Sequence, residues 1–152
     1  MQDKTLSKDD LVAHFRLKPV NTGDYRALHR VLKALGIRLV GGTTQWSVVW
    51  SALGLAPQQD AQVAADLMEP LLNAKAAAAL IGVSPSIIYR WSKGHVPTDL
   101  PPFPTAIDLS GGRKDARGLR WRRAEVKAWH SHSPLPVYAR KAPVYGSLTP
   151  TQ

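Results

Sequence analysis

Five side chains between residues 84 and 93 have the types and the spacing to bind nucleic acid. Ser86 and Arg90 are four residues apart, as are Tyr89 and Lys93, so each pair would share one side of a helix. Arg90 is the strongest candidate for a base contact, because a guanidinium can donate two hydrogen bonds to the edge of a guanine. The others, Ser84, Ser86, Tyr89 and Lys93, could bond a phosphate or a base, and the alternative for each is an ordinary solvent-facing side chain.

A second basic group follows between residues 113 and 122. Glycines flank most of it, and a basic loop between glycines can follow a phosphate backbone or enter a minor groove. We therefore predict that this group contacts DNA beside the helix. A mobile loop that only keeps the protein soluble is the alternative. The members of the group are Arg113, Lys114, Arg117, Arg120 and Arg122.

The distribution of charge favours the same half of the chain. The 152 residues carry 20 Lys and Arg against 11 Asp and Glu, which gives a formal charge of +9. Residues 1–70 hold eight basic and seven acidic side chains, whereas residues 71–152 hold twelve and four, so +8 of the charge lies in the second half. A surplus confined to one half is typical of a surface that meets a polyanion.

A weaker basic set occurs in the first half. Arg26, Arg30 and Lys33 fall on one side of a predicted helix, opposite a row of leucines, and form a second candidate DNA-binding face. A solvated helix face explains the same spacing equally well. A dimerisation or partner-binding role for this part of the chain is a further alternative.

The sequence offers little for catalysis or metal binding. It contains no cysteine, and its histidines lack the spacing of a zinc site; His130 and His132 have no cysteine or acidic residue close by. There is no phosphate-binding glycine loop and no nucleophile elbow. We therefore expect no enzyme activity, no metal and no cofactor.

Location follows from similar arguments. No apolar run approaches the roughly 20 residues that a membrane helix needs, and the first residues do not have the layout of a secretion signal. The lack of cysteine agrees with a reducing compartment. We expect a cytoplasmic, nucleoid-associated protein that does not contact a membrane.

Two short helices separated by a glycine turn would position the first group. Asn73 can cap an alanine-rich helix that ends at Gly82, where a left-handed residue is favoured. Ser84 and Pro85 then supply a cap hydroxyl and a proline for the first position of a second helix, which stops at Gly94. This pattern predicts a helix-turn-helix.

A β-hairpin and a third helix complete the second half. Residues 105–109 and 119–121 alternate like two strands and enclose a long turn that carries the second basic group. A helix from about Arg123 to His130 follows. After residue 133 the chain is rich in proline, which predicts an extended or disordered tail.

The first half repeats this plan faintly. Ser7 starts a helix with a capping-box-like pattern, and a second helix from about Asp24 ends at Gly36. Residues 37–40 and 43–50 flank a glycine pair and predict another hairpin.

The predicted fold class is therefore mainly α-helical with small β-hairpin wings: a winged helix-turn-helix, with a second one in tandem as the alternative for the first half. Four segments are expected. Residues 1–56 form a helix–helix–hairpin module, which would be the second winged helix or a dimerisation module, and residues 57–70 form a linker or connecting helix. Residues 71–133 form the winged helix-turn-helix DNA-binding domain, and residues 134–152 form the tail.

The second half resembles a known family. Its stretch from Leu72 to Arg90, which includes the helix-turn-helix pattern, is similar to the opening of AlpA-like and excisionase-type winged helices, relatives of the MerR DNA-binding domain. Phe103 and Pro104 match the Phe-Pro before the family's first wing strand, and the chain from Trp121 to Trp129 resembles its return from the wing into a helix. This sequence departs from the family by an insertion at residues 95–102 and a longer wing loop.

The resemblance implies that the helix beginning at Pro85 enters the major groove and that Trp121, Val126 and Trp129 pack in the core. We therefore expect a sequence-specific double-stranded DNA-binding protein, a transcriptional regulator or an excisionase of a bacterial mobile element. It would act as a homo-oligomer on DNA, with an integrase or RNA polymerase as further partner. A small terminase subunit for DNA packaging is one alternative, and a protein-interaction adaptor with a basic surface is another.

Overall fold

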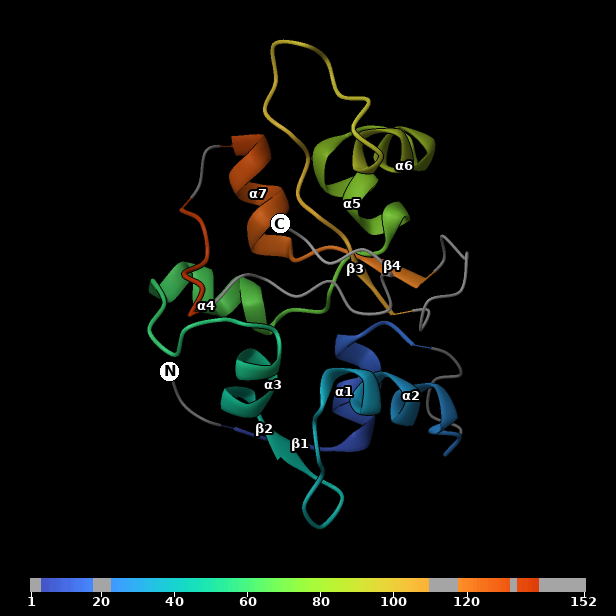
Figure 1. Cartoon of the computed structure of the whole chain (residues 1–152), viewed down its shortest axis with the longest axis vertical. Coiled ribbons are helices and arrows are strands. Elements are labelled where there is room, and N and C mark those ends of the chain that lie inside the picture. Colours follow the sequence, from blue (N-terminus) through green and yellow to red (C-terminus); the bar gives the residue numbers. More distant parts are fainter. Residues whose placement is uncertain (1–3, 18–22, 110–117, 132–133, 140–152) are drawn as a thin grey trace.

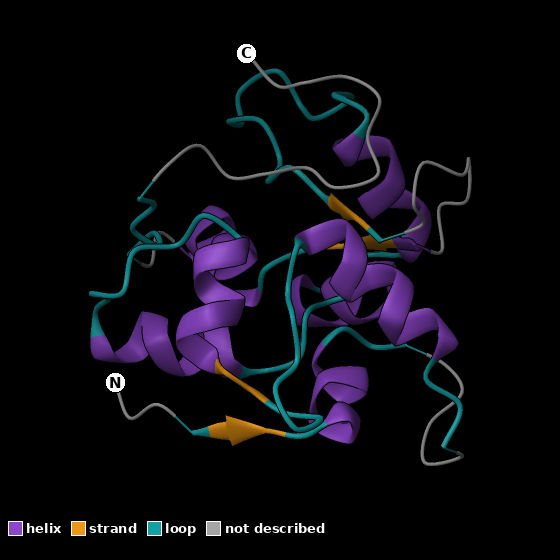
Figure 2. Ribbon diagram, turned by 60° about the horizontal axis from the view of Figure 1, so that its bottom comes forward, coloured by secondary structure: helices purple, strands orange, loops and turns teal. Residues whose placement is uncertain are grey.

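The computed structural model describes residues 4–17, 23–109, 118–131 and 134–139. These residues form seven α-helices and two antiparallel sheets of two strands each (Figure 1), so the chain is mainly helical as expected. Figure 2 shows that the two strand pairs lie apart from each other among the helices. The elements are β1 (Thr5–Leu6), α1 (Lys8–His14), α2 (Arg26–Leu35), β2 (Thr44–Gln45), α3 (Trp46–Ala52), α4 (Ala61–Met68), α5 (Ala74–Ile81), α6 (Pro85–Ser92), β3 (Ile107–Asp108), β4 (Leu119–Arg120) and α7 (Arg123–Ser131).

Helix α1 begins, and helix α2 ends, where the local sequence predicts, whereas α2 begins at Arg26, two residues later than expected. Ser7 caps α1 by accepting a hydrogen bond from the backbone of Asp10, whose carboxylate in turn accepts one from the backbone of Ser7, and this completes a capping box. Gly36 ends α2 with a left-handed backbone, φ 74°. One face of α2 is buried and the other carries its charged residues, which explains why periodicity alone located this helix.

The hairpin expected at residues 37–50 is wrong. Val40 and Thr43 do form an isolated bridge across the glycine turn, but β2 pairs with β1 and the chain then enters α3. Trp46, Val49 and Trp50 are buried on one side of that helix. The β-branched and aromatic residues of this stretch favour a strand, and burial of a helical face in the hydrophobic cluster of the first half outweighs that preference. The first half is therefore not a second helix–helix–hairpin module.

The second half follows its predicted order. Helix α4 occupies the segment expected to be a linker or connecting helix. Helices α5 and α6 pack against each other, the β3–β4 pair follows, and α7 returns beside α5 and α4 (Figure 1). Leu72, just before α5, exchanges two backbone hydrogen bonds of 2.8 Å with Trp121, just after β4. This bridge ties the start of the helix pair to the base of the hairpin.

Buried side chains form two clusters that divide between Leu71 and Leu72. The first cluster contains the apolar residues of the first half, and the second contains those of α5, α6 and the residues around Phe103, Trp121 and Val126. The division is incomplete, because Ile107 of β3 and Ala124 of α7 belong to the first cluster. The two halves are therefore packed on each other.

Residues 134–139, the described part of the predicted tail, belong to no helix or strand and are held against the first half. Val137 accepts a hydrogen bond from the backbone of Ala56, and its own amide donates to the side chain of Gln59. Tyr138 forms a bridge with Leu55, and its hydroxyl donates to Glu125 on α7 at 2.7 Å. This segment consequently links α7 to the turn after α3.

Candidate nucleic-acid interface

The geometry of the α5–α6 pair depends on three local features of the sequence. The side chain of Asn73 caps α5 by accepting a hydrogen bond from the backbone of Ala76 at 2.8 Å. Gly82 ends α5 with φ 78°, a conformation that other residues adopt only with strain. Pro85 occupies the first turn of α6, where its missing amide hydrogen is not needed. The turn between the helices is therefore short and specified by sequence.

Helix α6 presents a polar face on the side opposite its buried residue. Ile88 is fully buried against α5, whereas Ser86, Arg90 and Lys93 are exposed. At 3.6 residues per turn these three side chains fall within an arc of about 60°. Neither Arg90 nor Lys93 forms an ion pair with any residue that the structure describes. The face consequently carries two positive side chains that have no ion-pair partner among the described residues. The opposite side of the helix is packed against α5.

Two of the expected contact residues have additional or different roles. Tyr89 is half-buried, and its ring meets that of Trp121 edge-on with centroids 6.5 Å apart, so it supports α6 while its edge stays accessible. Ser84 starts α6, but its hydroxyl does not cap the helix as expected. It lies 3.0 Å from the hydroxyl of Ser86, which leaves both groups exposed beside the first turn of α6.

The hairpin β3–β4 begins beside this helix pair. Ile107 pairs with Arg120 and Asp108 with Leu119. Three members of the second basic group, Arg113, Lys114 and Arg117, lie outside the described residues, in the loop between these strands. The structure therefore positions the base of the predicted wing.

Arg120 requires a correction, because it does not reach the surface. Only 7% of the residue is exposed, and its guanidinium donates hydrogen bonds to the carbonyl oxygens of Phe15 at 2.9 Å and Arg16 at 2.8 Å. Burial, and then the charge of Arg16, lowers the pKa of this group from its usual value. The carbonyls belong to the end of α1, where the negative end of the helix dipole favours a cation. Arg120 joins the two halves, and the prediction that it contacts DNA is wrong.

Arg122 requires the same correction. It is 2% exposed and lies near Glu125, with 3.4 Å between its Nη1 and Oε1, and near the carbonyl of Leu53. Its guanidinium also lies over the ring of Tyr138, 5.4 Å from the centroid. The sequence alone could not distinguish these two buried arginines from the basic residues of the loop. An arginine at the end of a strand has the same sequence surroundings whether its side chain is buried or exposed.

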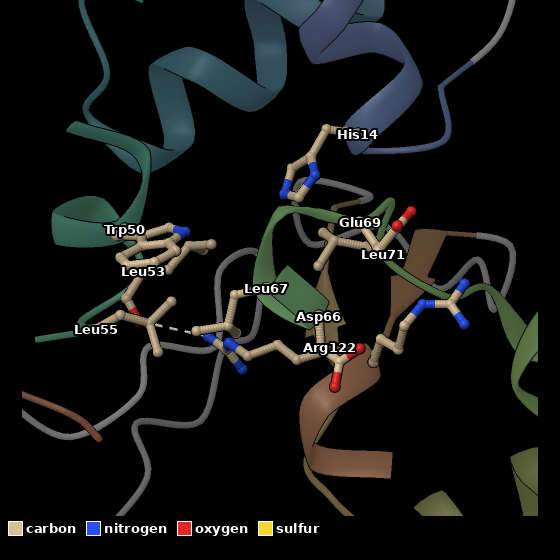
Figure 3. A pocket seen from close by; sticks show the side chains of 10 residues that line it. His14, Trp50, Leu53, Leu55, Asp66, Leu67, Glu69, Leu71 and Arg122 are labelled. Carbon is tan, nitrogen blue, oxygen red and sulfur yellow. Dashed lines mark hydrogen bonds between the residues drawn. The ribbon is translucent and has the colours of Figure 1, made fainter. Parts of the chain in front are cut away.

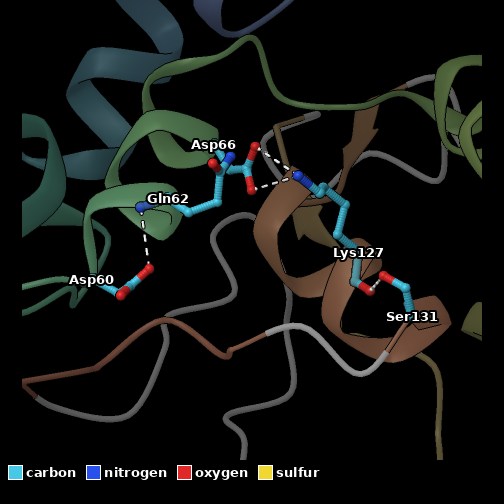
Figure 4. Close-up of polar contacts among 5 residues, drawn as sticks. All are labelled: Asp60, Gln62, Asp66, Lys127 and Ser131. Atoms are coloured by element: carbon cyan, nitrogen blue, oxygen red, sulfur yellow. Dashed lines mark hydrogen bonds and ion pairs between the residues drawn. The ribbon is translucent and has the colours of Figure 1, made fainter.

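The junction between the halves contains further polar contacts that sequence analysis did not anticipate. Lys127 of α7 binds both carboxylate oxygens of Asp66 on α4, at 2.9 and 3.1 Å (Figure 4). The side chain of Arg16 donates to the carbonyl of Leu71, whose amide donates to the carbonyl of His14 at 2.8 Å. No local motif marks such long-range pairs, so only the folded chain reveals them.

A small cavity also lies at this junction, lined by residues of both halves (Figure 3). His14 is 5% exposed, and burial lowers its pKa to about 4, partly offset by a hydrogen bond with the backbone of Glu69. The indole Nε1 of Trp50 and the Nε of Arg122 have no hydrogen-bond partner among the described residues. The space open to the centre of a water molecule is only about 10 Å³, enough for about one water and too small for a substrate.

The second candidate face on α2 is exposed but unevenly charged. Arg26 is bound to Asp24, with 2.8 Å between Nη2 and Oδ2, which largely neutralises it. Arg30 and Lys33 are also exposed, on the side opposite the buried leucines. The three residues therefore share one face as predicted, and two of them can meet a partner.

Comparison with known proteins adds no relative. The chain matches no family model, no curated protein and no solved structure. Within the described residues there is no group of three or more His, Asp or Glu side chains that could hold a metal ion, and no helix is long and apolar enough to cross a membrane.

Proposed function

We propose that this chain binds double-stranded DNA through a winged helix-turn-helix formed by residues 71–133. In this arrangement α6 enters the major groove and the β3–β4 hairpin lies on the neighbouring phosphate backbone. The observation that carries the proposal is the face of α6, where Ser86, Arg90 and Lys93 are exposed without an acidic partner among the described residues. The helix that carries them is packed into the protein through the buried side chain of Ile88 and through the aromatic contact between Tyr89 and Trp121.

Element order supports the same proposal. A helix pair, a hairpin and a closing helix follow one another, and the bridge between Leu72 and Trp121 joins the start of the pair to the hairpin. This is the order that the resemblance to AlpA-like and excisionase-type proteins implies. We therefore propose that the protein regulates transcription or acts as an excisionase of a bacterial mobile element, two roles that would use one DNA-binding surface. RNA polymerase or an integrase would be the respective partner.

Equilibrium binding of the full chain to random-sequence duplex, measured between about 50 and 200 mM salt, tests DNA binding. Binding to phosphates releases counterions, so affinity should fall steeply as salt rises. A protein-interaction adaptor would show no salt-sensitive affinity for DNA, and that result would contradict the proposal. A small terminase subunit would bind DNA in the same assay but prefer packaging-site DNA over other duplexes.

The role of Arg90 can be tested by the substitution Arg90→Ala. We expect a decrease of about 1–3 kcal/mol in binding free energy on a selected cognate site and little change on random duplex, because a base contact acts only on the correct sequence. Lys93→Ala on the same face is the matched comparison and should weaken binding to both DNAs, because it removes an amine that binds phosphate. Equal decreases on the two DNAs from Arg90→Ala would show that Arg90 binds phosphate instead.

A further inference from the structure

An open groove in the first half is lined by basic side chains from two helices. Lys8 comes from α1, and His29 and Lys33 come from α2, while Leu32, Ile37 and Leu39 line the apolar part of the groove. Its volume is about 380 Å³, and none of the described residues that line it is acidic. Lys8 and His29 were not singled out from the sequence, because they lie outside the periodic set of Arg26, Arg30 and Lys33.

The ring of Tyr25 supports one of the two lysines of the groove. The amine of Lys8 lies 5.1 Å from the centroid of the Tyr25 ring, and the Tyr25 hydroxyl donates a hydrogen bond of 2.9 Å to Asp9. Lys33 is exposed near the end of α2 and has no ion pair with a described residue. The groove therefore carries two lysine amines, of which one is packed on a neighbouring ring.

The nearby carboxylates are committed to other partners. Asp9 accepts from Tyr25, Asp10 accepts from the backbone of Ser7, and Asp24 binds Arg26. Asp9 and Asp10 keep their charge, because their partners are neutral donors, but no described carboxylate forms an ion pair with Lys8 or Lys33. The two lysine amines can therefore bind an anionic partner.

Helices α1 and α2, which contribute side chains to the groove, and helix α6 lie on opposite sides of the β3–β4 pair in the view of Figure 1. On one side, Tyr89 of α6 contacts Trp121 at the end of β4. On the other, Arg120 of β4 binds the carbonyl of Phe15 at the end of α1, and α1 packs against α2. Strand β4 therefore connects the packing of α6 with that of α1 and α2.

We propose that the groove of Lys8, His29 and Lys33 binds the phosphate backbone of duplex DNA, so that one chain contacts DNA on both sides of the hairpin. This inference rests on the proposed function. Two lysine amines suit a phosphodiester, because a compact point charge binds a phosphate and adds affinity and salt dependence but no sequence preference. A second contact also lengthens the site that one copy covers.

The double substitution Lys8→Gln and Lys33→Gln in the full chain tests this proposal. Affinity is measured against salt on a duplex of about three helical turns and on one of about one turn. On the longer duplex the slope of log affinity against log salt should fall by about 1.8, because each phosphate that is no longer neutralised lowers the slope by about 0.9. On the shorter duplex, which α6 alone can occupy, the slope should stay unchanged.

Arg26→Gln is the matched control, because Arg26 lies on the same helix, is paired with Asp24 and does not line the groove. It should change neither slope, and thermal melting should show that every variant is folded. If the double variant had an unchanged slope on both duplexes, the groove would not bind DNA. If the slope decreased equally on both duplexes, the groove would not form a separate contact on the far side of the hairpin. If the wild-type chain itself bound no DNA, the proposed function would fail together with this inference.

Discussion

At the scale of single residues, burial separates two kinds of arginine. The guanidinium of Arg120 lies inside the protein and donates to backbone carbonyls of both halves, including those of Phe15 and Arg16. Arg90 carries the same group on the surface of α6, with no ion pair to a described residue. A buried charge is tolerated only where hydrogen bonds replace its hydration, so its partners become part of the stability of the fold.

The substitution Arg120→Ala should therefore act on folding. It leaves carbonyl oxygens of Phe15 and Arg16 unpaired at a buried position, and each unpaired group costs about 1–3 kcal/mol. We expect urea denaturation to show a free energy of unfolding lower by at least about 2 kcal/mol. Arg26→Ala, whose side chain is 84% exposed, should change it by less than about 0.5 kcal/mol. A stable Arg120→Ala variant with weakened DNA binding would restore Arg120 to the interface.

His14 should make stability depend on pH. In the folded protein its pKa is lowered to about 4, mainly by burial, whereas the unfolded value is 6.5. Above pH 6.5 the histidine is neutral in both states and has no effect; as the pH falls below 6.5 the unfolded state binds a proton first, so stability decreases until the folded state titrates near pH 4. We expect a decrease of about 2 kcal/mol between about pH 7.5 and 5.

Urea denaturation across this pH range measures the effect of His14. His14→Gln should be less stable at neutral pH and should remove most of the pH dependence. His29→Gln, at an exposed position, should leave that dependence intact. The assignment would be wrong if the His29 variant abolished the pH dependence and the His14 variant kept it.

At the scale of elements, caps and glycine turns decide where most helices begin and end. The chain stops α5 at Gly82 and restarts at Ser84, because a left-handed residue ends one helix and a proline suits the first turn of the next. The orientation of α6, and with it the direction of Arg90, depends on this turn.

Gly82→Ala tests that dependence. A Cβ at this position would meet no atom within 4 Å, so the cost comes from the backbone, which has φ 78°. We expect the free energy of unfolding to fall by about 1–2 kcal/mol, measured by denaturant unfolding, and to fall less for Gly82→Asn because asparagine tolerates this conformation better. If both variants were as stable as the wild type, the turn would not be strained.

At the scale of the whole molecule, the two halves share contacts that a boundary at residue 70 would cut. Ile107 and Ala124 pack in the cluster of the first half, Lys127 binds Asp66, and Arg120 binds the end of α1. The elements that follow the helix pair α5–α6, namely β3, β4 and α7, are thus packed against residues 1–70. We therefore expect the first half to stabilise the hairpin whether or not it contacts DNA.

A fragment of residues 71–133 should consequently be less stable than the same region in the full chain. It lacks the packing around Ile107, which is completely buried, and the partners of Arg120 and Lys127. We expect its unfolding midpoint in urea to fall well below that of the full chain. Ile107→Ala in the full chain should also lower the urea midpoint, because it should decrease the free energy of unfolding by about 2–5 kcal/mol. A fragment that unfolds at the same urea concentration as the full chain would show that the second half folds alone.

Local sequence determined the elements whose signals are local. Asn73, Gly82 and Pro85 set the ends of α5 and α6, and the leucine face of α2 marked that helix, because caps, left-handed glycines and a 3.6-residue period act within one or two turns. The exposed face of α6 follows directly from this periodicity.

Tertiary structure decided the rest. It turned the stretch from Trp46 to Ala52 into a helix, because burying three residues of one helical face outweighs a weak strand propensity. It also moved Arg120 and Arg122 from the expected interface to the junction between the halves. Phe15 and Arg16, whose carbonyls accept hydrogen bonds from Arg120, lie more than 100 positions away in the sequence. No local pattern encodes a contact that exists only once both halves have folded against each other.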